Sequence, residues 1–363
     1  MSIVAIDLFS GSGGTTVGLK KAGVKVVGAV EIDKIACKTY NYNNPEVHLI
    51  NDDIKNVKSG QLKSLVKNNR LLLVACPPCQ GFSSIRNGGE NDIRNELVFE
   101  YLRLIIELQP DFLLMENVAG MSKGKGKKIF SKFTKSIAHK YEFKFDVLNA
   151  ADYGVPQIRR RLVLHGVRKD IVQKHDIEVQ LPMKTHSQSG QDGLKKWINA
   201  SVILGLPKID AGESYEDPKG KILNHVACGL SDLNKQRIRF IRKHGGNRDS
   251  LPQELTKNWK RNLSGHTDVY GILDITKPSI TMTGGCMTYS KGRFGHPFED
   301  RALSAREAAR LQSFDDSYVF FGNKNQLARQ IGNAVPVKLS EASGKIFKKI
   351  DEELRENVKE RPY

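Results

Sequence analysis

Short apolar runs and amphipathic stretches alternate along the first half of the chain. The apolar runs have the length and composition of buried β-strands, and they lie at residues 3–6, 24–30, 71–75, 112–115 and 161–167. The stretch 96–108 has its apolar side chains at helical spacing, and Pro110 ends it. Strands and helices that alternate in this way form an α/β domain with a mostly parallel sheet. We therefore predict such a sheet for residues 1–168.

The pattern changes after about residue 168. Glycine, proline, asparagine and lysine become frequent, and the alternation of helices and strands fades. Helical spacing returns over residues 304–314, where Ser304 and Glu307 form a capping box, and a last helix is expected from about Val337 onward. These changes predict three segments, at 1–168, 169–290 and 291–363.

Composition places the chain among globular proteins with a polyanionic partner. Hydrophobic residues make up 39% of it, which excludes a disordered chain. The formal net charge is +17, and such a balance favours nucleic acid, because neutralised phosphates release counterions. A proteome that is basic throughout would give the same charge without any nucleic-acid role.

The sequence gives no indication of a membrane or of export. No apolar run approaches the roughly 20 residues that a membrane span needs. The first seven residues lack the basic and then apolar layout of a signal peptide, and they fit a first β-strand instead. We therefore expect a cytoplasmic protein.

The cysteines are too few and too scattered for a disulfide framework. They stand at positions 37, 76, 79, 228 and 286. Any cysteine with a chemical role is therefore expected to act as a thiol.

A glycine-rich turn follows the first predicted strand. Residues 7–14 (Asp-Leu-Phe-Ser-Gly-Ser-Gly-Gly) lead into a helical stretch, and glycines there let the backbone approach a ligand closely. Glu31 ends the second strand, where a carboxylate can bind ribose hydroxyls, and Asp53 follows a third short strand. Together these features favour a nucleoside cofactor, such as NAD, FAD, a nucleotide or S-adenosylmethionine. A plain tight turn with two surface acids is the alternative.

The segment 75–83 (Ala-Cys-Pro-Pro-Cys-Gln-Gly-Phe-Ser) follows a strongly apolar strand. It therefore lies at the carboxyl edge of the sheet, where ligand crevices form. Two prolines fix the backbone, and a rigid turn suits a cysteine nucleophile that must be held in place. Cys76 and Cys79 also have C-x-x-C spacing, so a redox dithiol or half of a zinc site is an alternative, although no second pair follows.

Charged residues accompany two further strands. Glu116 and Asn117 follow the run 112–115 at the same sheet edge as Cys79, where Glu116 could act as a general acid or merely cap a turn. Arg159 and Arg161 precede the next strand and would share one face of an extended segment. Their guanidinium groups suit a base carbonyl, a carboxylate or a phosphate, and a solvated basic patch is the alternative.

These motifs, in this order, resemble those of the DNA (cytosine-5) methyltransferases. The resemblance covers nearly the whole chain apart from about 169–275, and it includes 306–314 (Arg-Glu-Ala-Ala-Arg-Leu-Gln-Ser-Phe) and 330–336 (Gln-Ile-Gly-Asn-Ala-Val-Pro). It implies a Rossmann-like S-adenosylmethionine-dependent methyltransferase sheet with a smaller, irregular target-recognition domain at 169–290. It also implies that the C-terminal segment 291–363 returns to the catalytic domain.

The resemblance implies that Cys79 is the nucleophile, because the family's cysteine precedes a glutamine; Cys76 would be a bystander. The thiolate would add to C6 of a cytosine that has flipped out of the duplex, so that C5 can accept the methyl group. A protonated Glu116 would bond to N3 of the base, and Arg161 would bond to O2.

The remaining predicted catalytic residues would hold other groups of the site in position. Arg159 would steady the nucleophile loop or a phosphate, and Asn117 would position the contact of Glu116. Residues 80–94 resemble the loop that closes over the flipped base, and an ordinary surface loop is the alternative.

The cofactor would be S-adenosylmethionine, and no metal is expected. Glu31 would hold the ribose, and Asp53 and Ile54 would meet the adenine. The full pocket implied by the resemblance comprises Phe9, Ser12, Gly14, Glu31, Asp53, Ile54, Pro78, Leu97, Asn333 and Val335.

The irregular stretch would bind DNA, because basic residues alternate there with aromatic ones. The expected contacts are Arg237, Arg239, Arg242, Lys243, Arg248, Lys260 and Arg261. A solvated face or a small satellite core is the alternative. Another basic run, Lys123–Lys128, is expected to be a solvated loop, with phosphate contact as the alternative.

Three other functions fit parts of the sequence. A tRNA-modifying branch of the family usually carries Cys-Phe-Thr in its variable region, a tripeptide this sequence lacks. A DNA-binding regulator without activity would not need Cys79, Glu116 and Arg161. An NAD-dependent oxidoreductase would explain the glycine-rich turn alone. We therefore expect a monomer that methylates double-stranded DNA at a specific sequence and protects it from a cognate restriction endonuclease.

Overall fold

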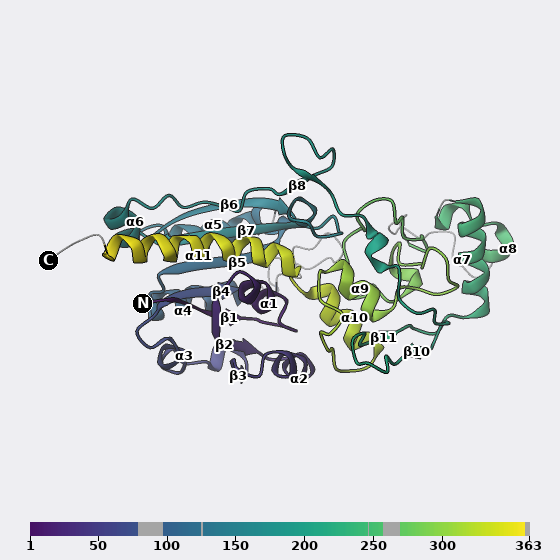
Figure 1. Cartoon of the computed structure of the whole chain (residues 1–363), viewed down its shortest axis with the longest axis horizontal. Coiled ribbons are helices and arrows are strands. Elements are labelled where there is room, and N and C mark those ends of the chain that lie inside the picture. Colours follow the sequence, from purple (N-terminus) through teal and green to yellow (C-terminus); the bar gives the residue numbers. More distant parts are fainter. Residues whose placement is uncertain (79–96, 125, 246, 257–268, 360–363) are drawn as a thin grey trace. The chain divides into compact units, whose positions relative to one another are not determined.

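The computed structural model of the chain describes residues 1–78, 97–124, 126–245, 247–256 and 269–359. The chain forms two compact units (Figure 1). The first comprises residues 1–153, 160–185 and 335–363, and the second comprises residues 154–159 and 186–334. In the ranges given above, every helix is too short or too polar to cross a membrane.

The first unit is built on one seven-stranded sheet. In spatial order its strands are β3 (His48–Asn51), β2 (Lys25–Glu31), β1 (Ile3–Leu8), β4 (Arg70–Ala75), β5 (Phe112–Val118), β7 (Arg160–Arg168) and β6 (Tyr141–Asn149). The strands from β3 to β5 run parallel, whereas β7 is antiparallel to both β5 and β6. The predicted α/β fold is confirmed, and the sheet is mixed.

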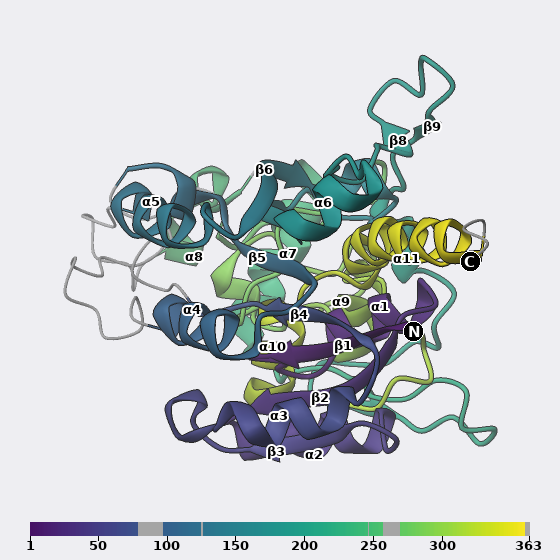
Figure 2. The same ribbon diagram turned by 90° about the vertical axis from the view of Figure 1, so that its left-hand side faces the viewer.

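Helices cover both faces of this sheet (Figure 2). They are α1 (Gly14–Lys21), α2 (Lys34–Asn43), α3 (Ser59–Val66), α4 (Leu97–Leu108), α5 (Gly126–Ile137), α6 (Lys169–His175) and α11 (Val337–Lys359). Successive side chains of a strand point to opposite faces. Val4, Ile6 and Leu8 of β1 therefore join one buried core with α3, α4 and α5. Asp7 points to the other face, where it bonds to Thr16 of α1.

The helices α1 and α11 pack together on that second face, and their contact depends on a glycine. A Cβ atom on Gly18 would lie 2.4 Å from the carbonyl oxygen of Val337 and 2.5 Å from Cβ of Ser340. The middle of α11 reaches the sheet through Phe347, whose ring centroid lies 5.9 Å from that of Phe112 and 4.6 Å from that of His165. The helix predicted from about Val337 is thus confirmed, and it belongs to the first unit.

The second unit has little regular structure. Its helices are α7 (Asp232–His244), α8 (Gln253–Thr256), α9 (Ala305–Leu311) and α10 (Lys324–Asn333), and its short strand pairs are β8 (His186–Ser187) with β9 (Lys195–Lys196) and β10 (Ser214–Tyr215) with β11 (His225–Val226). The predicted capping box is confirmed, because the Ser304 hydroxyl accepts from the Glu307 N–H and the Glu307 carboxylate accepts from the Ser304 N–H.

The two compact units of the structure begin and end at other positions than 168 and 290, the domain boundaries expected from the sequence pattern. Residues 169–185 pack with the sheet, and residues 291–334 belong to the second unit. The reason lies in α9, which packs against the short 3-10 helix Ala200–Ile203 and against β11. Helical spacing predicts such a helix but does not show which part of the chain it packs against.

The Gly18 contact predicts a large effect of one methyl group. Gly18→Ala forces α1 and α11 apart and should lower the free energy of unfolding by about 2 kcal/mol or more, as overpacking does. Gly60→Ala in α3 is the matched control, since no atom lies within 4 Å of the added Cβ. That variant should be more stable by about 0.5 kcal/mol, because alanine favours a helix. Urea unfolding measures the free energy of unfolding of both variants. Equal changes in the two variants would contradict the close packing of α1 on α11 at Gly18.

His165 predicts a loss of stability in acid. Its ring is buried, with Nδ1 2.8 Å from the carbonyl oxygen of Gln180, and burial lowers the pKa of His165 from 6.5 to about 4. Between these values the unfolded chain binds a proton that the folded chain does not, so stability falls as the pH falls through this window. The free energy of unfolding that is lost in this way is about 3 kcal/mol.

The measurement compares wild type with His165→Gln by urea unfolding from pH 7 to pH 4. The free energy of unfolding of the variant should fall less steeply with acid, so the gap between the two proteins narrows by about 3 kcal/mol. A gap that stays constant with pH would show that His165 does not titrate in this way.

Candidate active site

The carboxyl ends of β1 and β4 meet at the centre of the sheet in the first unit. The chain leaves β1 toward β2 on one side and reaches β5 from β4 on the other, so strand order reverses between them. Ligands of open α/β sheets bind at such a switch point. The glycine-rich turn follows β1 here, and the segment Cys76–Pro78 follows β4.

Glu31 fixes the glycine-rich turn against β2. Its Oε2 accepts the N–H of Gly11 at 2.8 Å, and its Oε1 accepts the N–H groups of Ile32 and Asp33 at 3.0 and 2.8 Å. Burial raises the pKa of Glu31, and these hydrogen bonds act in the opposite direction. Phe9 and Gly11 adopt positive φ angles of 58° and 53°, which curl the backbone of the turn. Oε2 accepts a single hydrogen bond and keeps a second lone pair, so Glu31 can still accept from a ribose hydroxyl.

Asp7 lies directly beneath this turn, and the sequence interpretation gave it no role of its own. The Thr16 hydroxyl donates to Asp7 Oδ2 at 2.8 Å and lies 2.7 Å from the hydroxyl of Tyr40. The carboxyl group is fully buried, and burial raises the pKa of Asp7 to about 7, with a smaller contribution from Glu31. Its position at the end of the first strand, just before the glycines, was the feature that could have identified it.

The other predicted cofactor residues are divided between core and surface. Asp53 caps the short 3-10 helix Ile54–Asn56 by accepting the N–H of Lys55 at 3.0 Å, and Ile54 is only 3% exposed within the core. Phe9 and Leu97 are partly buried against that same core. The first unit contains Phe9, Ser12, Gly14, Glu31, Asp53, Ile54, Pro78, Leu97 and Val335, whereas Asn333 belongs to the second unit.

Cys76 carries a partly buried free thiol, and Cys79 lies outside the described residues. The Cys76 sulfur lies 3.6 Å from the Thr15 hydroxyl. Burial raises the pKa of Cys76 well above its usual value, and the carboxyl groups of Glu116 and Asp7 add to this effect. A thiol that is held protonated is a poor nucleophile. The chemistry of Cys76 therefore agrees with the interpretation that it is a bystander.

Glu116 and Arg161 form an ion pair at this edge. Arg161 Nε lies 3.0 Å from Glu116 Oε1, and both side chains are about 85% covered, with 15% and 14% of their surface exposed. The strand register explains the pairing, because Val118 of β5 stands opposite Arg161 of β7 and Glu116 is two residues away on the same face. Burial lowers the pKa of Arg161, and the Glu116 carboxylate opposes this shift.

Asn117 ties the end of β5 to the turn after β4. Its Nδ2 donates to the carbonyl oxygen of Pro77 at 2.9 Å, and its Oδ1 accepts the N–H of Val118 at 2.8 Å. The side chain is buried. Asn117 therefore holds the backbone two residues before Cys79.

Arg159 and Gln157 bind backbone inside the second unit. Arg159 is 2% exposed and donates to the carbonyl oxygens of Met282, Gly332 and Ala334 at 2.7, 3.0 and 3.1 Å. Gln157 Nε2 donates to Leu311 O at 3.0 Å and to Gln312 Oε1 at 2.8 Å. Buried charges are paired or hydrogen-bonded in this way when they hold a structure together. Arg159 is predicted to steady the nucleophile loop or a phosphate, and both Cys79 and the loop 80–94 lie outside the described residues.

Comparison with known proteins decides the family. The family model for the C-5 cytosine-specific DNA methylase matches residues 3–350. The chain belongs to this family. This methyltransferase is 35% identical to the type II methyltransferase M1.HphI of Haemophilus parahaemolyticus over 94% of the chain and 86% of the relative. It is 34% identical to the type II methylase M.HgiDII of Herpetosiphon aurantiacus over 98% of each chain.

A solved structure shows the same fold. The methyltransferase superposes on a candidate DNA modification methyltransferase encoded within an E. coli prophage with a TM-score of 0.70, at 27% identity and over 99% of this chain and 100% of that one. The predicted family and activity are therefore confirmed: the protein is a DNA (cytosine-5) methyltransferase. The glycine-rich turn belongs to this family's sheet and is not the mark of an oxidoreductase.

The predicted DNA contacts of the methyltransferase differ in exposure. Arg237 is 5% exposed, donates to Leu255 O at 2.9 Å and lies over the ring of Tyr270. Arg237 is thus engaged within the second unit, and its contact with DNA stays a prediction. Lys243 is exposed and the Arg248 side chain is mostly covered, while Lys260 and Arg261 lie outside the described residues.

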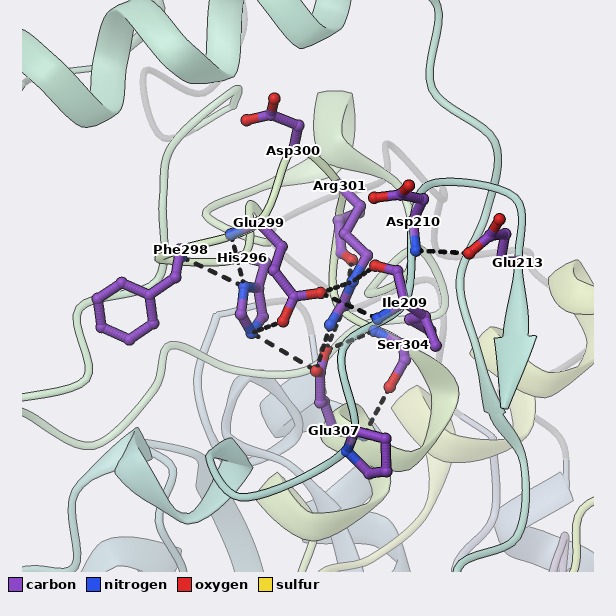
Figure 3. A network of polar contacts seen from close by, with 12 residues as sticks. Ile209, Asp210, Glu213, His296, Phe298, Glu299, Asp300, Arg301, Ser304 and Glu307 are labelled. Atoms are coloured by element: carbon purple, nitrogen blue, oxygen red, sulfur yellow. Dashed lines mark hydrogen bonds and ion pairs between the residues drawn. The ribbon is translucent and has the colours of Figure 1, made fainter. Parts of the chain in front are cut away.

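Arg239 and Arg242 of α7 share one carboxylate. Arg239 Nε lies 2.5 Å from Asp300 Oδ2, and Arg242 Nη1 lies 2.8 Å from Asp300 Oδ1. Asp300 projects from a segment that a buried network holds in place (Figure 3). In that network Arg301 makes two bonds to the Glu307 carboxylate, at 2.8 and 2.7 Å. Arg242 is therefore oriented by its neighbours, whereas the Arg239 side chain stays 62% exposed.

No group of three or more metal-ligating side chains occurs in the part of the methyltransferase that the structure describes.

The Asn117 bond predicts a defect in catalysis. Asn117→Ala frees the Pro77 carbonyl and loosens the turn before Cys79, so kcat for DNA methylation should fall by about 10- to 100-fold with little change in KM. Asn69→Ala is the matched control, because Asn69 also donates to a backbone carbonyl, that of Val66, but far from the catalytic edge. Steady-state kinetics and thermal unfolding separate the two. A normal kcat in Asn117→Ala with a lowered Tm would show that the bond serves only the fold.

Proposed function

We propose that this methyltransferase uses S-adenosylmethionine as methyl donor, Cys79 as nucleophile, and the Glu116–Arg161 pair to hold the target cytosine of double-stranded DNA. The observation that carries the proposal is the ion pair at 3.0 Å, one strand away from the turn that leads to Cys79. A carboxyl group and a guanidinium at this spacing complement N3 and O2 of a pyrimidine.

The residues at the switch point fit a nucleoside donor. Gly11 has a positive φ and open space around the position of a Cβ atom, so its backbone can approach a ligand. Glu31 offers carboxylate lone pairs at the end of β2, and Asp53 offers another carboxylate after β3. When bound, S-adenosylmethionine supplies an electrophilic methyl group on a positively charged sulfur. The chain would hold it with the predicted set of Phe9, Ser12, Gly14, Glu31, Asp53, Ile54, Pro78, Leu97, Asn333 and Val335.

The chain's own groups would activate the base. The Cys79 thiolate forms a bond to C6, and the electron pair of the 5,6-double bond then becomes available at C5 for the new carbon–carbon bond. Glu116 donates a hydrogen bond to N3 and Arg161 to O2, which offsets the charge that develops on the ring. Loss of the C5 proton to a base restores the double bond as the Cys79 sulfur leaves C6.

The ion pair between Glu116 and Arg161 is the arrangement of the site before the base enters. Arg161 favours the ionised form of Glu116, whereas a hydrogen bond to N3 needs the protonated form. Glu116 would therefore take up a proton as the flipped cytosine arrives and Arg161 turns to O2. Arg159 would act through the backbone of the segment it binds, and this makes it a positioning residue.

The relatives support a restriction–modification role. M1.HphI and M.HgiDII are both named as type II enzymes, and this chain spans 86% and 98% of their lengths. We propose that the methyltransferase protects a specific duplex sequence from a cognate restriction endonuclease. A monomer suffices for this task, because the reaction modifies one base at a time.

The test incubates the protein with S-adenosylmethionine labelled in its methyl group and with duplex DNA or tRNA. We expect label in DNA alone, and bisulfite sequencing of DNA from expressing cells should show 5-methylcytosine at one sequence motif. Glu116→Gln should lower kcat by about 10²-fold or more, as loss of a general acid does. If the label appeared in tRNA and not in DNA, the proposed substrate would be wrong.

A further inference from the structure

The helix α7 carries an exposed arginine whose orientation is fixed by a carboxylate. Ile238 and Ile241 of this helix are buried in the second unit, whereas Arg239 is exposed. Asp300 Oδ2 accepts from Nε of Arg239 at 2.5 Å. In the part of the chain that the structure describes, Nη1 and Nη2 of Arg239 donate to no other group. The guanidinium is therefore held at one edge, and its two terminal nitrogens are left for an acceptor from outside.

A buried network holds the segment that carries Asp300 in place (Figure 3). Arg301 is only 1% exposed and binds the Glu307 carboxylate through both terminal nitrogens and the Glu299 carboxylate through Nε. Arg242 of α7 donates to the backbone carbonyl of Glu299 at 2.5 Å, which ties the same segment to the helix. The Asp300 carboxylate is thus a fixed support for the arginine that binds it.

Another arginine of the second unit shows how a purely structural ion pair is built. Arg310 binds both oxygens of Asp316 through Nε and Nη2, at 2.8 and 2.6 Å, and its Nη1 donates to two backbone carbonyl oxygens. The Arg310 side chain is 19% exposed, against 62% for Arg239. The contact between Arg239 and Asp300 differs, because it orients the arginine and leaves the terminal nitrogens available.

The charge around Arg239 favours an uncharged acceptor over a phosphate. Asp300 places a negative charge between Arg239 and Arg242. A phosphate at Arg239 would also meet this carboxylate, and repulsion between the two anions would cancel part of the attraction. The O6 and N7 atoms of guanine carry no formal charge, and together they accept two N–H bonds from one guanidinium. The surroundings of Arg239 therefore suit a base edge better than a DNA backbone.

An exposed aromatic residue lies on the same segment as Asp300. Phe298 is 63% exposed, and its backbone N–H donates to Nδ1 of the buried His296 at 3.3 Å (Figure 3). Aromatic residues and arginines are enriched where proteins bind their partners, whereas ordinary solvated surfaces are richer in lysine and glutamate. The composition of this surface is thus typical of a recognition site.

We propose that Arg239, oriented by Asp300, reads a guanine of the recognised DNA sequence. The terminal nitrogens of Arg239 donate to O6 and N7 in the major groove, and Asp300 is a positioning residue that acts through Arg239. The inference rests on the proposed function, because it needs a duplex substrate. A duplex site that contains the target cytosine has a guanine on its other strand, so the substrate contains at least one such base.

The experiment starts from the motif that bisulfite sequencing gives for the wild-type protein. In duplexes of this motif each guanine is replaced in turn by 7-deazaguanine, which lacks the N7 acceptor, and fluorescence anisotropy measures the Kd of the full chain. At one position the replacement should weaken wild-type binding by about 3- to 10-fold, the share of one bond in a bidentate pair. Arg239→Gln should lose this sensitivity at that position and keep the wild-type response at all others.

The variant Asp300→Asn separates orientation from charge. Base reading predicts that this variant binds the cognate duplex about fivefold or more weakly and responds less to 7-deazaguanine at the same position. Asp316→Asn is the matched control, because Asp316 also binds an arginine Nε and the two aspartate side chains are 29% and 28% exposed. The control should keep the wild-type response to every replacement.

Thermal unfolding should give the wild-type Tm for Arg239→Gln, which changes an exposed side chain. If wild type and Arg239→Gln respond alike to 7-deazaguanine at every position, Arg239 reads no guanine and the inference is overturned while the proposed function stands. Tighter binding of random-sequence DNA by Asp300→Asn, with unchanged discrimination of the motif, would assign Arg239 to the phosphate backbone and also overturn it. If the wild type does not methylate duplex DNA, the proposed function itself fails.

Discussion

The antiparallel pairing of β5 with β7 is the constraint on which the catalytic edge depends. Its register sets Val118 opposite Arg161, so that the side chains of Glu116 and Arg161 emerge on one face and meet at 3.0 Å. The preceding strands of the sheet run parallel, and their ends supply the other parts of the site. A carboxylate and a guanidinium therefore meet beside the turn after β4, where Asn117 holds the backbone leading to Cys79.

Much of the parallel half of the fold was predictable, because its buried strands are almost purely apolar. The runs 71–75 and 112–115 correspond to β4 and β5 within a few residues. The edge strand β6 was not predicted, although its alternation of apolar residues with Glu142, Lys144 and Asp146 is the pattern of a half-buried strand. The direction of β7 was also beyond sequence patterning, which marks where strands lie but not how they pair.

The site shows the same division between residue type and residue environment. Sequence motifs identified Glu116, Arg161 and Glu31, but not that Glu31 binds the turn it was expected to accompany. They also grouped Arg237 with Arg239, although α7 turns the first into the unit and leaves the second exposed. Burial depends on which segments pack together, and Asp300 comes from some 60 residues further along the chain.

The central claim is that the thiol of residue 79, and not that of Cys76, bonds to the base held by Glu116 and Arg161. Duplex DNA containing 5-fluorocytosine at the target position tests it directly, because fluorine at C5 cannot leave as a proton and the covalent adduct accumulates. Mass spectrometry of the trapped complex should place the adduct on Cys79, with Cys76→Ala still trapped and Cys79→Ser not. An adduct on Cys76, or none in the wild-type protein despite methylation of ordinary DNA, would contradict the account.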